Sequence, residues 1–359
     1  MSSRLVSVFC EMVRIDSESG NEQAFLDYLA RLFVQDLGAS CQFDGFGNLV
    51  ARVPARHCAD KPPVLFGCHG DTVKPGRGIV PVVKDGVVRS QGDTILGADD
   101  KAGIAELYEA VLTATQHPPL EIVITREEET GLVGAKNLDV SLLTAQMGFI
   151  LDGDTIDSVV IGGPSHMLID VEITGRAAHA GMEPEKGVSA IRAAAHAISI
   201  LKEGWVDPQT TCNVGIIEGG RIRNGVPEKA FVKAECRSLD HDTCLAYSDT
   251  IKEAFEVSAR AIGAQAEVKL ELGYRAMRVP DDAPVLAAAR QAIERAGLTP
   301  DLRVICGGTD ASILNAKGIQ SVILGVGGRA EHSSDEHIYI SDMEAAVKLL
   351  HHLFAVLCE

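Results

Sequence analysis

The sequence lacks several features that would assign it to large classes of proteins. Its 359 residues contain no apolar run that approaches the length needed to span a bilayer. Basic residues are scarce, with 33 Lys and Arg against 50 Asp and Glu, and the net charge of −17 argues against a nucleic-acid partner. Residues 1–20 include the acidic Glu11 and no cleavable apolar core, so we expect an amphipathic helix there and not a signal peptide. These absences favour a soluble, cytoplasmic protein without a membrane partner.

Cysteine pairs are also absent. The nine cysteines are scattered along the chain, are odd in number and never form a C-x-x-C pair. This pattern argues against both a disulfide framework and a cysteine-type zinc site. We therefore expect most cysteines to be small buried side chains in a reducing compartment.

The order of apolar patterns predicts an α/β domain that is interrupted by a smaller domain. In residues 1–165, short apolar runs alternate with helical stripes, which is typical of a largely parallel mixed sheet flanked by helices. Residues 166–273 change to alternating strands around helical stretches at 189–201 and 242–261, which indicates an inserted α+β domain with an antiparallel sheet. The α/β pattern returns in residues 274–359, so we expect them to complete the first domain.

Five polar segments interrupt this apolar scaffold. They are CHGDTV at 68–73, LGADDKAG at 96–103, TREEETG at 125–131, LDGD at 151–154 and GRAEHSSDEH at 328–337. Most of them directly follow a predicted strand, and ligands of open α/β sheets bind at the carboxyl ends of strands. We therefore expect the segments to converge on one site, although each alone is also compatible with a solvated turn.

The residue types in these segments suit a centre of two zinc ions. Imidazole and carboxylate groups are normal zinc ligands, and the candidates are His69, Asp99, Glu129, Asp152 and His332. Asp99 is the best candidate to bridge both ions, because its short side chain lies on a loop flanked by Gly and Ala. Such a pair of ions can hold and activate a water molecule. Cobalt and manganese suit the same ligands.

Two further acidic residues have predicted roles beside these ligands. Asp71 follows His69 by two positions and can accept the other ring N–H of that histidine. Glu128 lies beside Glu129 and is placed to take a proton from the activated water as general base. The residues alone leave three rivals open, namely Asp100 for Asp99, Glu127 for Glu128 and His337 for His332.

Eight motifs resemble, in chain order, those of the peptidase T / acetylornithine deacetylase / succinyl-diaminopimelate desuccinylase family of dizinc hydrolases. They are HGDTV, LGADDKAG, REEETGLVGAK, ILDGD, GRAAHAG, RNGVPEKA, GGTDASIL and HSSDEH, and they cover nearly the whole chain. The ADDK and EE-x-G segments are the most specific of them. In detail the sequence is most similar to the peptidase T branch, which contains aminotripeptidases.

The resemblance implies a division of the metal ligands between two ions. One zinc would be held by His69, Asp99 and Asp152, and the other by Asp99, Glu129 and His332. It also implies that the peptide bond between Asp99 and Asp100 is cis. On the same basis His332, Asp99 and Glu128 are preferred to their rivals.

The resemblance further implies roles for the middle domain. This domain would be a lid that also forms a homodimer in many family members. His179 would stabilise the tetrahedral oxyanion, Asn224 would contact the substrate, and Arg237 would bind a substrate carboxylate with both arms of its guanidinium group.

The predicted function is hydrolysis of short peptides, most specifically as an aminotripeptidase, by a zinc-bridging water with Glu128 as general base. The alternative is an N-acyl amino acid deacylase of the acetylornithine or succinyl-diaminopimelate type, which would use the same centre. A third hypothesis is a catalytically silent scaffold that has kept the fold. It predicts a lost ligand or a lost base, and the sequence retains both.

Overall fold

The computed structural model describes residues 2–359, which fold into two compact units. The first unit comprises the chain up to Gly162 together with Arg278–Ile305 and Thr309–Glu359. The second comprises Gly163–Met277 together with Cys306–Gly308. The first is an α/β unit and the second is an α+β unit with an antiparallel sheet, so the predicted fold class is confirmed.

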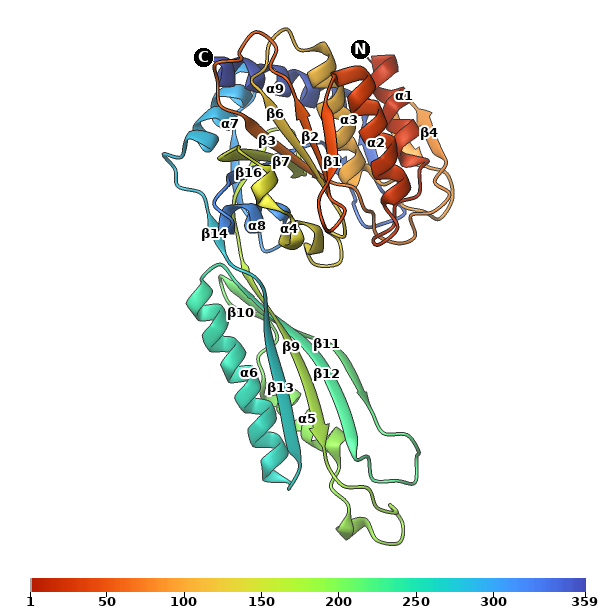
Figure 1. Ribbon diagram of the computed structural model, residues 1–359. Coiled ribbons are helices and arrows are strands. Elements are labelled where there is room, and N and C mark those ends of the chain that lie inside the picture. The colour runs from red at the N-terminus through yellow and green to blue at the C-terminus, as the bar shows by residue number, and fades with distance from the viewer. Residues whose placement is uncertain (1) are drawn as a thin grey trace. The chain divides into compact units, whose positions relative to one another are not determined.

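The first unit is built on a nine-stranded mixed sheet with the order β1-β2-β6-β3-β7-β16-β8-β14, in which β15 pairs with β8 (Figure 1). Its strands are β1 (Ser40–Phe43), β2 (Leu49–Val53), β3 (Val64–His69), β6 (Leu120–Thr125), β7 (Met147–Gly153), β8 (Ser158–Gly163), β14 (Met277–Arg278), β15 (Asp301–Val304) and β16 (Gln320–Gly325). The central strands β6, β3, β7 and β16 are parallel to their neighbours in this group. Every residue of β3 is buried, which explains its continuous apolar run.

Helices pack against this sheet through their apolar sides. They are α1 (Ser2–Val13), α2 (Gln23–Leu37), α3 (Ala98–Thr113), α4 (Val133–Asn137), α7 (Pro284–Arg295), α8 (Asp310–Ala316) and α9 (Ile340–Cys358), with a short 3₁₀ turn at Val140–Leu142. The expected N-terminal amphipathic helix is α1, which buries Leu5 and Phe9. Phe66 of β3 lies 5.4 Å from Phe149 and 5.6 Å from Phe354 between ring centroids, so aromatic packing joins the sheet to α9.

A second, four-stranded sheet in the same unit has the order β17-β18-β5-β4. Its strands are β4 (Pro81–Lys84), β5 (Val87–Ser90), β17 (Gly328–Arg329) and β18 (His337–Tyr339). The antiparallel pairing of β17 with β18 fixes both ends of the segment between them, which contains His332. This small sheet therefore positions one of the predicted metal ligands.

The second unit is a five-stranded antiparallel sheet with the order β10-β11-β12-β9-β13. Its strands are β9 (Ser165–Thr174), β10 (Gly204–Asp207), β11 (Thr210–Gly219), β12 (Lys229–Ser238) and β13 (Gln265–Tyr274). The helices α5 (Ala190–Ile200) and α6 (His241–Ala261) cover one face (Figure 1), and Pro184–Lys186 forms a 3₁₀ turn. Buried and more exposed residues alternate along β9, as expected for a sheet with one covered face.

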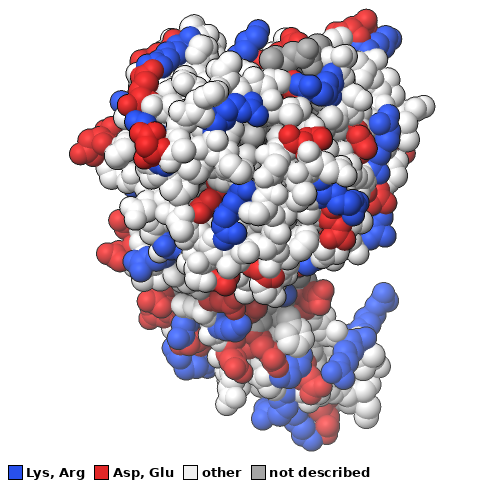
Figure 2. Space-filling view, turned by 45° about the horizontal axis from the view of Figure 1, so that its top comes forward, with Lys and Arg blue, Asp and Glu red and all other residues white. Residues whose placement is uncertain are grey.

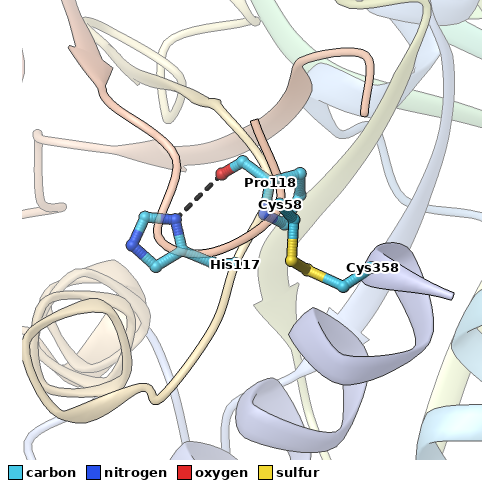
Figure 3. Close-up of a disulfide and its surroundings, with 4 residues drawn as sticks. All are labelled: Cys58, His117, Pro118 and Cys358. Atoms are coloured by element: carbon cyan, nitrogen blue, oxygen red, sulfur yellow. Dashed lines mark hydrogen bonds between the residues drawn. A yellow bond between two sulfur atoms is a disulfide. The ribbon is translucent and has the colours of Figure 1, made fainter. Parts of the chain in front are cut away.

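The cysteines depart from the sequence-based expectation at one point. Cys58 and Cys358 form a disulfide that joins the segment before β3 to the end of α9 (Figure 3), with 5.7 Å between their Cα atoms. The two residues are 300 positions apart, so no spacing pattern could indicate the bond. The other seven cysteines are free thiols, and five of them are buried as expected, namely Cys10, Cys68, Cys212, Cys236 and Cys244.

Two surface properties bear on the expected partners. Within residues 2–359, no helix combines the length and the apolar character that crossing a bilayer requires. Figure 2 shows Lys and Arg side chains interspersed with Asp and Glu side chains on the face that it displays. The net charge of −17 is therefore not gathered into one acidic patch on that face.

Candidate metal centre

The predicted metal ligands lie at neighbouring strand ends of the first unit. His69 is the last residue of β3, Glu129 follows the end of β6, and Asp152 is the sixth residue of β7. Because these three strands are adjacent and parallel, their carboxyl ends meet at the same edge of the sheet. Asp99 comes from the first turn of α3, and His332 from the segment between β17 and β18.

Asp99 faces both histidines, and it does so with different oxygens. Its Oδ1 lies 2.9 Å from Nε2 of His69, and its Oδ2 lies 3.1 Å from Nε2 of His332. The other two ligands complete the two sides of this arrangement. Asp152 Oδ1 is 3.8 Å from Nε2 of His69, and Glu129 Oε1 is 2.9 Å from Nε2 of His332. One carboxylate thus lies between two His–carboxylate pairs.

The donor atoms also meet a geometric condition for holding a cation. In each of two sets, His69–Asp99–Glu129 and His69–Asp100–Asp152, the potential ligand atoms all lie within 4.8 Å of one another. Oε1 of Glu129 is buried without a hydrogen-bond partner, although it is close to His332. A buried carboxylate oxygen needs a compensating charge or donor. The residues present therefore fit divalent cations.

Asp100 and Asp99 differ in environment although they are adjacent. Asp100 is fully buried, and its Oδ2 accepts a hydrogen bond from the backbone N–H of His69 at 3.1 Å. Burial raises the pKa of the Asp100 carboxyl well above its usual value. Asp99 remains partly exposed and faces both histidines. The peptide bond between the two residues is cis, which confirms the expectation from the family resemblance.

Asp71 is a fully buried carboxylate that accepts several hydrogen bonds. Its Oδ1 accepts from the backbone N–H of Glu128 at 2.9 Å, and its Oδ2 accepts from that of Glu129 at 3.2 Å and from Ser19 Oγ at 2.7 Å. Burial opposes ionisation, but His69 and these donors outweigh it and hold the pKa of Asp71 below its usual value. Asp71 therefore remains ionised and fixes the backbone of the two glutamates.

The contact between Asp71 and His69 has an unexpected component. Nδ1 of His69 lies 3.0 Å from the backbone carbonyl oxygen of Asp71 and 3.4 Å from its carboxylate Oδ1. The carbonyl is therefore the nearer acceptor for this ring nitrogen. A proton on Nδ1 leaves the lone pair of Nε2 facing Asp99 and Asp152, which is the tautomer that binds a metal.

Glu128 lies in an environment that raises the pKa of its carboxyl group. Burial, together with neighbouring carboxylates such as Asp310, raises its pKa well above the usual glutamate value, against the opposing effect of His69. A carboxylate with a raised pKa accepts a proton more readily near neutral pH. Its rival Glu127 has a backbone φ of 51°, and its N–H donates to Glu22 at 3.2 Å.

Several supporting residues had no role predicted from the sequence, although Asp310 lies in the GGTDASIL motif. Glu22 is fully buried and forms an ion pair with Arg126, with 2.9 Å between Oε2 and Nη2. Ser19 donates to Asp71, as described above. Asp310 is buried at the start of α8 and accepts a hydrogen bond from Thr125 at 2.5 Å, while its Oδ1 has no partner. These contacts join residues far apart in the chain, so no local pattern could indicate them.

The predicted substrate-binding residues belong to the second unit. His179 and Asn224 are exposed and line a cavity of about 760 Å³, formed by residues 177–179, 218–222, 224–229 and 231. The two segments are joined by a hydrogen bond from the Ala180 N–H to the Asn224 carbonyl at 3.0 Å. Nδ1 of His179 accepts from the N–H of Gly181 at 3.2 Å, which leaves the ring proton on Nε2.

Arg237 does not line this cavity. Its guanidinium donates through Nη1 to the carbonyl oxygen of Cys306 at 3.2 Å and through Nη2 to Glu235 at 3.2 Å. Its Nε is buried and has no hydrogen-bond partner. This buried donor is therefore unsatisfied within the fold. The structure thus brings His179 and Asn224 together and places Arg237 apart from them within the unit.

Comparisons with known proteins identify relatives of the whole chain. A family model described as a peptidase dimerisation domain matches residues 164–262, and one described as peptidase family M28 matches residues 48–172. The chain is 38% identical, over 97% of its own length and 96% of the relative's, to the uncharacterised protein YqjE of Bacillus subtilis. It is 25% identical to peptidase T of Escherichia fergusonii over 85% of this chain and 84% of that protein.

Two solved structures are similar over their full length. The aminopeptidase PepT of Bacillus cereus aligns with a TM-score of 0.91 and 37% identity, and covers 100% of this chain and 99% of its own. A tripeptidase of Staphylococcus aureus aligns with a TM-score of 0.95 and 36% identity, with the same coverage.

Proposed function

Because the chain belongs to the peptidase T family of metal-dependent peptidases, we propose that it hydrolyses short peptides, most specifically as an aminotripeptidase with two zinc ions. The observation that carries this proposal is the position of Asp99, whose two oxygens face His69 and His332 separately. Aminopeptidase and tripeptidase are the descriptions of the two solved structures that align over the whole chain.

The proposed metal ligands divide between two ions. His69, Asp99 and Asp152 would hold one ion, and Asp99, Glu129 and His332 the other. When bound, two divalent ions would polarise the scissile carbonyl and lower the pKa of a water molecule. Cobalt or manganese would suit the same donor atoms.

Glu128 is the proposed proton carrier. Its raised pKa lets the carboxylate take the proton of the attacking water and pass it to the leaving amine. Asp71 would hold Glu128 in place through the backbone N–H and would orient His69 through the contacts of Nδ1. Proton transfer by Glu128 would therefore depend on Asp71, which does not itself carry the proton.

Three residues of the second unit are proposed to bind the substrate. His179 would stabilise the oxyanion of the tetrahedral intermediate with its Nε2–H, since Nδ1 is an acceptor. Asn224, which lines the same cavity, would contact the peptide. Arg237 would bind the peptide's terminal carboxylate, because the planar guanidinium group suits a carboxylate.

A homodimer formed through the second unit is part of the proposal, because the peptidase dimerisation model matches residues 164–262. A cytoplasmic location is also proposed. In a reducing compartment, the disulfide between Cys58 and Cys358 would persist only if it resisted reduction by exchange with cellular thiols.

The test is amine release from a panel of small substrates, each with and without a chelator. The panel holds di-, tri- and tetra-alanine, N-acetylornithine and N-succinyl-diaminopimelate. We expect chelator-sensitive cleavage of the tripeptide, with no release from the acylated compounds. Cleavage of an acylated substrate instead would contradict the peptidase proposal while retaining the metal centre. No turnover with zinc supplied would contradict catalysis altogether.

A further inference from the structure

Glu336 is a buried carboxylate that the proposed reaction does not use. It lies in the segment between β17 and β18, four residues after His332, and only 2% of it is exposed. Both of its oxygens accept backbone hydrogen bonds from residues just before α3 and in its first turn. Oε2 accepts from the N–H groups of Leu96 at 2.7 Å and Gly97 at 2.8 Å, and Oε1 accepts from that of Asp99 at 3.0 Å.

The start of α3 needs an acceptor from elsewhere in the chain. The first N–H groups of a helix have no acceptor within the helix, and the residue that precedes α3, Gly97, offers no side chain to cap it. Gly97 has a φ of 72°, in the left-handed region that favours glycine. Asp99 and Asp100 both have non-helical backbone angles, so the first turn is not held by the regular helical pattern. Glu336 accepts from the N–H of Asp99 in the first turn and from the N–H groups of Leu96 and Gly97 just before the helix. Its negative charge also favours a helix N-terminus.

The same carboxylate is fixed within the segment that carries His332. The N–H of Glu336 donates to the carbonyl oxygen of Ser333 at 3.1 Å, and the N–H of Asp335 donates to Ser333 Oγ at 3.3 Å. His332 itself has a φ of 60°. Glu336 thereby ties the backbone that carries His332 to the backbone that carries Asp99, although these residues are far apart in the sequence.

The two ligands face each other across this pair of segments. His332 Nε2 and Asp99 Oδ2 lie 3.1 Å apart, and each side chain projects from a segment that Glu336 holds. We propose that Glu336 is a positioning residue that sets the separation of Asp99 and His332 and thereby the affinity for the divalent ion that they share. This inference rests on the metal centre of the proposed function.

The variant Glu336→Gln tests the inference. Glutamine has nearly the same shape, but one of its two terminal groups is an amide donor that would face a backbone N–H. Zinc affinity is measured on the metal-free protein by competition with a chromophoric chelator, which requires no peptide substrate. We expect two zinc ions per wild-type chain and a 10- to 100-fold weaker affinity for one of them in the variant, the range typical of residues that orient metal ligands.

Asp335→Asn is the matched control, because it removes an exposed carboxylate from the same segment. Its zinc affinity should equal that of the wild type. Glu336→Asp keeps the charge on a shorter side chain and should show an intermediate loss, which also serves if the glutamine variant does not fold. Folded Glu336 variants with wild-type affinity for both ions would overturn the inference alone. A wild-type chain that binds no divalent ion would overturn the metal centre itself and the inference with it.

Discussion

The carboxylate of Asp71 holds the backbone of Glu128, with 2.9 Å between Oδ1 and the backbone nitrogen. Glu336 holds the backbone of Asp99 in the same way, with 3.0 Å between Oε1 and the nitrogen. Neither Asp71 nor Glu336 is among the proposed metal ligands. Each is buried and ties down a segment whose own side chains face the centre. Loops that carry ligands thus derive their precision from carboxylates supplied by other parts of the chain.

Replacing Asp71 with asparagine tests the first of these ties. The amide keeps one acceptor oxygen, so the N–H of either Glu128 or Glu129 loses its partner. We expect kcat/KM for a tripeptide to fall by about 10- to 100-fold. Steady-state kinetics and metal analysis of the same preparation measure this. Ser19→Ala removes only the hydroxyl donor to Asp71 and should cause a smaller loss. An asparagine variant with wild-type kcat/KM would show that the tie has no effect on catalysis.

Glu128→Gln separates proton transfer from metal binding. Glutamine cannot accept the proton of the attacking water, so we expect kcat to fall by roughly 10²- to 10⁴-fold. The content of bound metal should stay at the wild-type level, because Glu128 is not a proposed ligand. Glu127→Gln changes the adjacent side chain in the same way and should leave kcat within a few fold of the wild type. Near-normal activity of the Glu128 variant with both metals bound would remove this residue from the mechanism.

How far the sequence predicts the centre can be seen from particular residues. His69 ends a run in which every residue is buried, so both the strand and the position of its last residue are visible in the sequence. Asp152 lies near the end of a similar run. Parallel strands place such ends together, and the convergence of these segments follows from that rule.

The residues that the sequence did not reveal depend on contacts between distant segments. Glu22 reads as an ordinary surface residue beside a helix, yet it is fully buried against Arg126. Glu336 lies in the HSSDEH motif, but the motif does not indicate its partners, because its three donors lie near residue 97. The partners of such groups are determined by the tertiary fold, which local patterns do not encode.

The burial of Glu106 should make the stability of the folded protein depend on pH. It is 1% exposed on α3, and its Oε1 has no hydrogen-bond partner. Burial and the nearby Asp100 raise its pKa well above the value of 4.5. The folded chain therefore holds a proton that the unfolded chain releases, so this residue makes the protein less stable as pH rises above about 4.5.

Glu106→Gln should remove this pH dependence. We expect the variant to resemble the wild type near pH 4.5 and to gain roughly 1–3 kcal/mol in free energy of unfolding, relative to it, by pH 8. Urea unfolding at both pH values measures the difference. Glu109→Gln is the matched control, because it makes the same change on the same helix. It breaks an ion pair with Arg4, so it should lower the free energy of unfolding and not raise it. A Glu106 variant that differs from the wild type equally at both pH values would mean that Glu106 is ionised in the fold.

The disulfide between Cys58 and Cys358 predicts a stability effect that is independent of the metal centre. The bond closes a loop across 300 positions of the chain, so it strongly restricts the unfolded state. Replacing both residues with serine should lower the free energy of unfolding by roughly 2–5 kcal/mol. Because Leu353 and Phe354 keep α9 packed in the core, kcat should not change.

Urea unfolding with and without reductant measures the stability effect of the disulfide. Reductant should lower the stability of the wild type towards that of the double variant and leave the double variant unaffected. Cys41→Ser, which removes a free thiol, should behave as the wild type. Nine alkylated cysteines in the unreduced protein would show that the bond does not form.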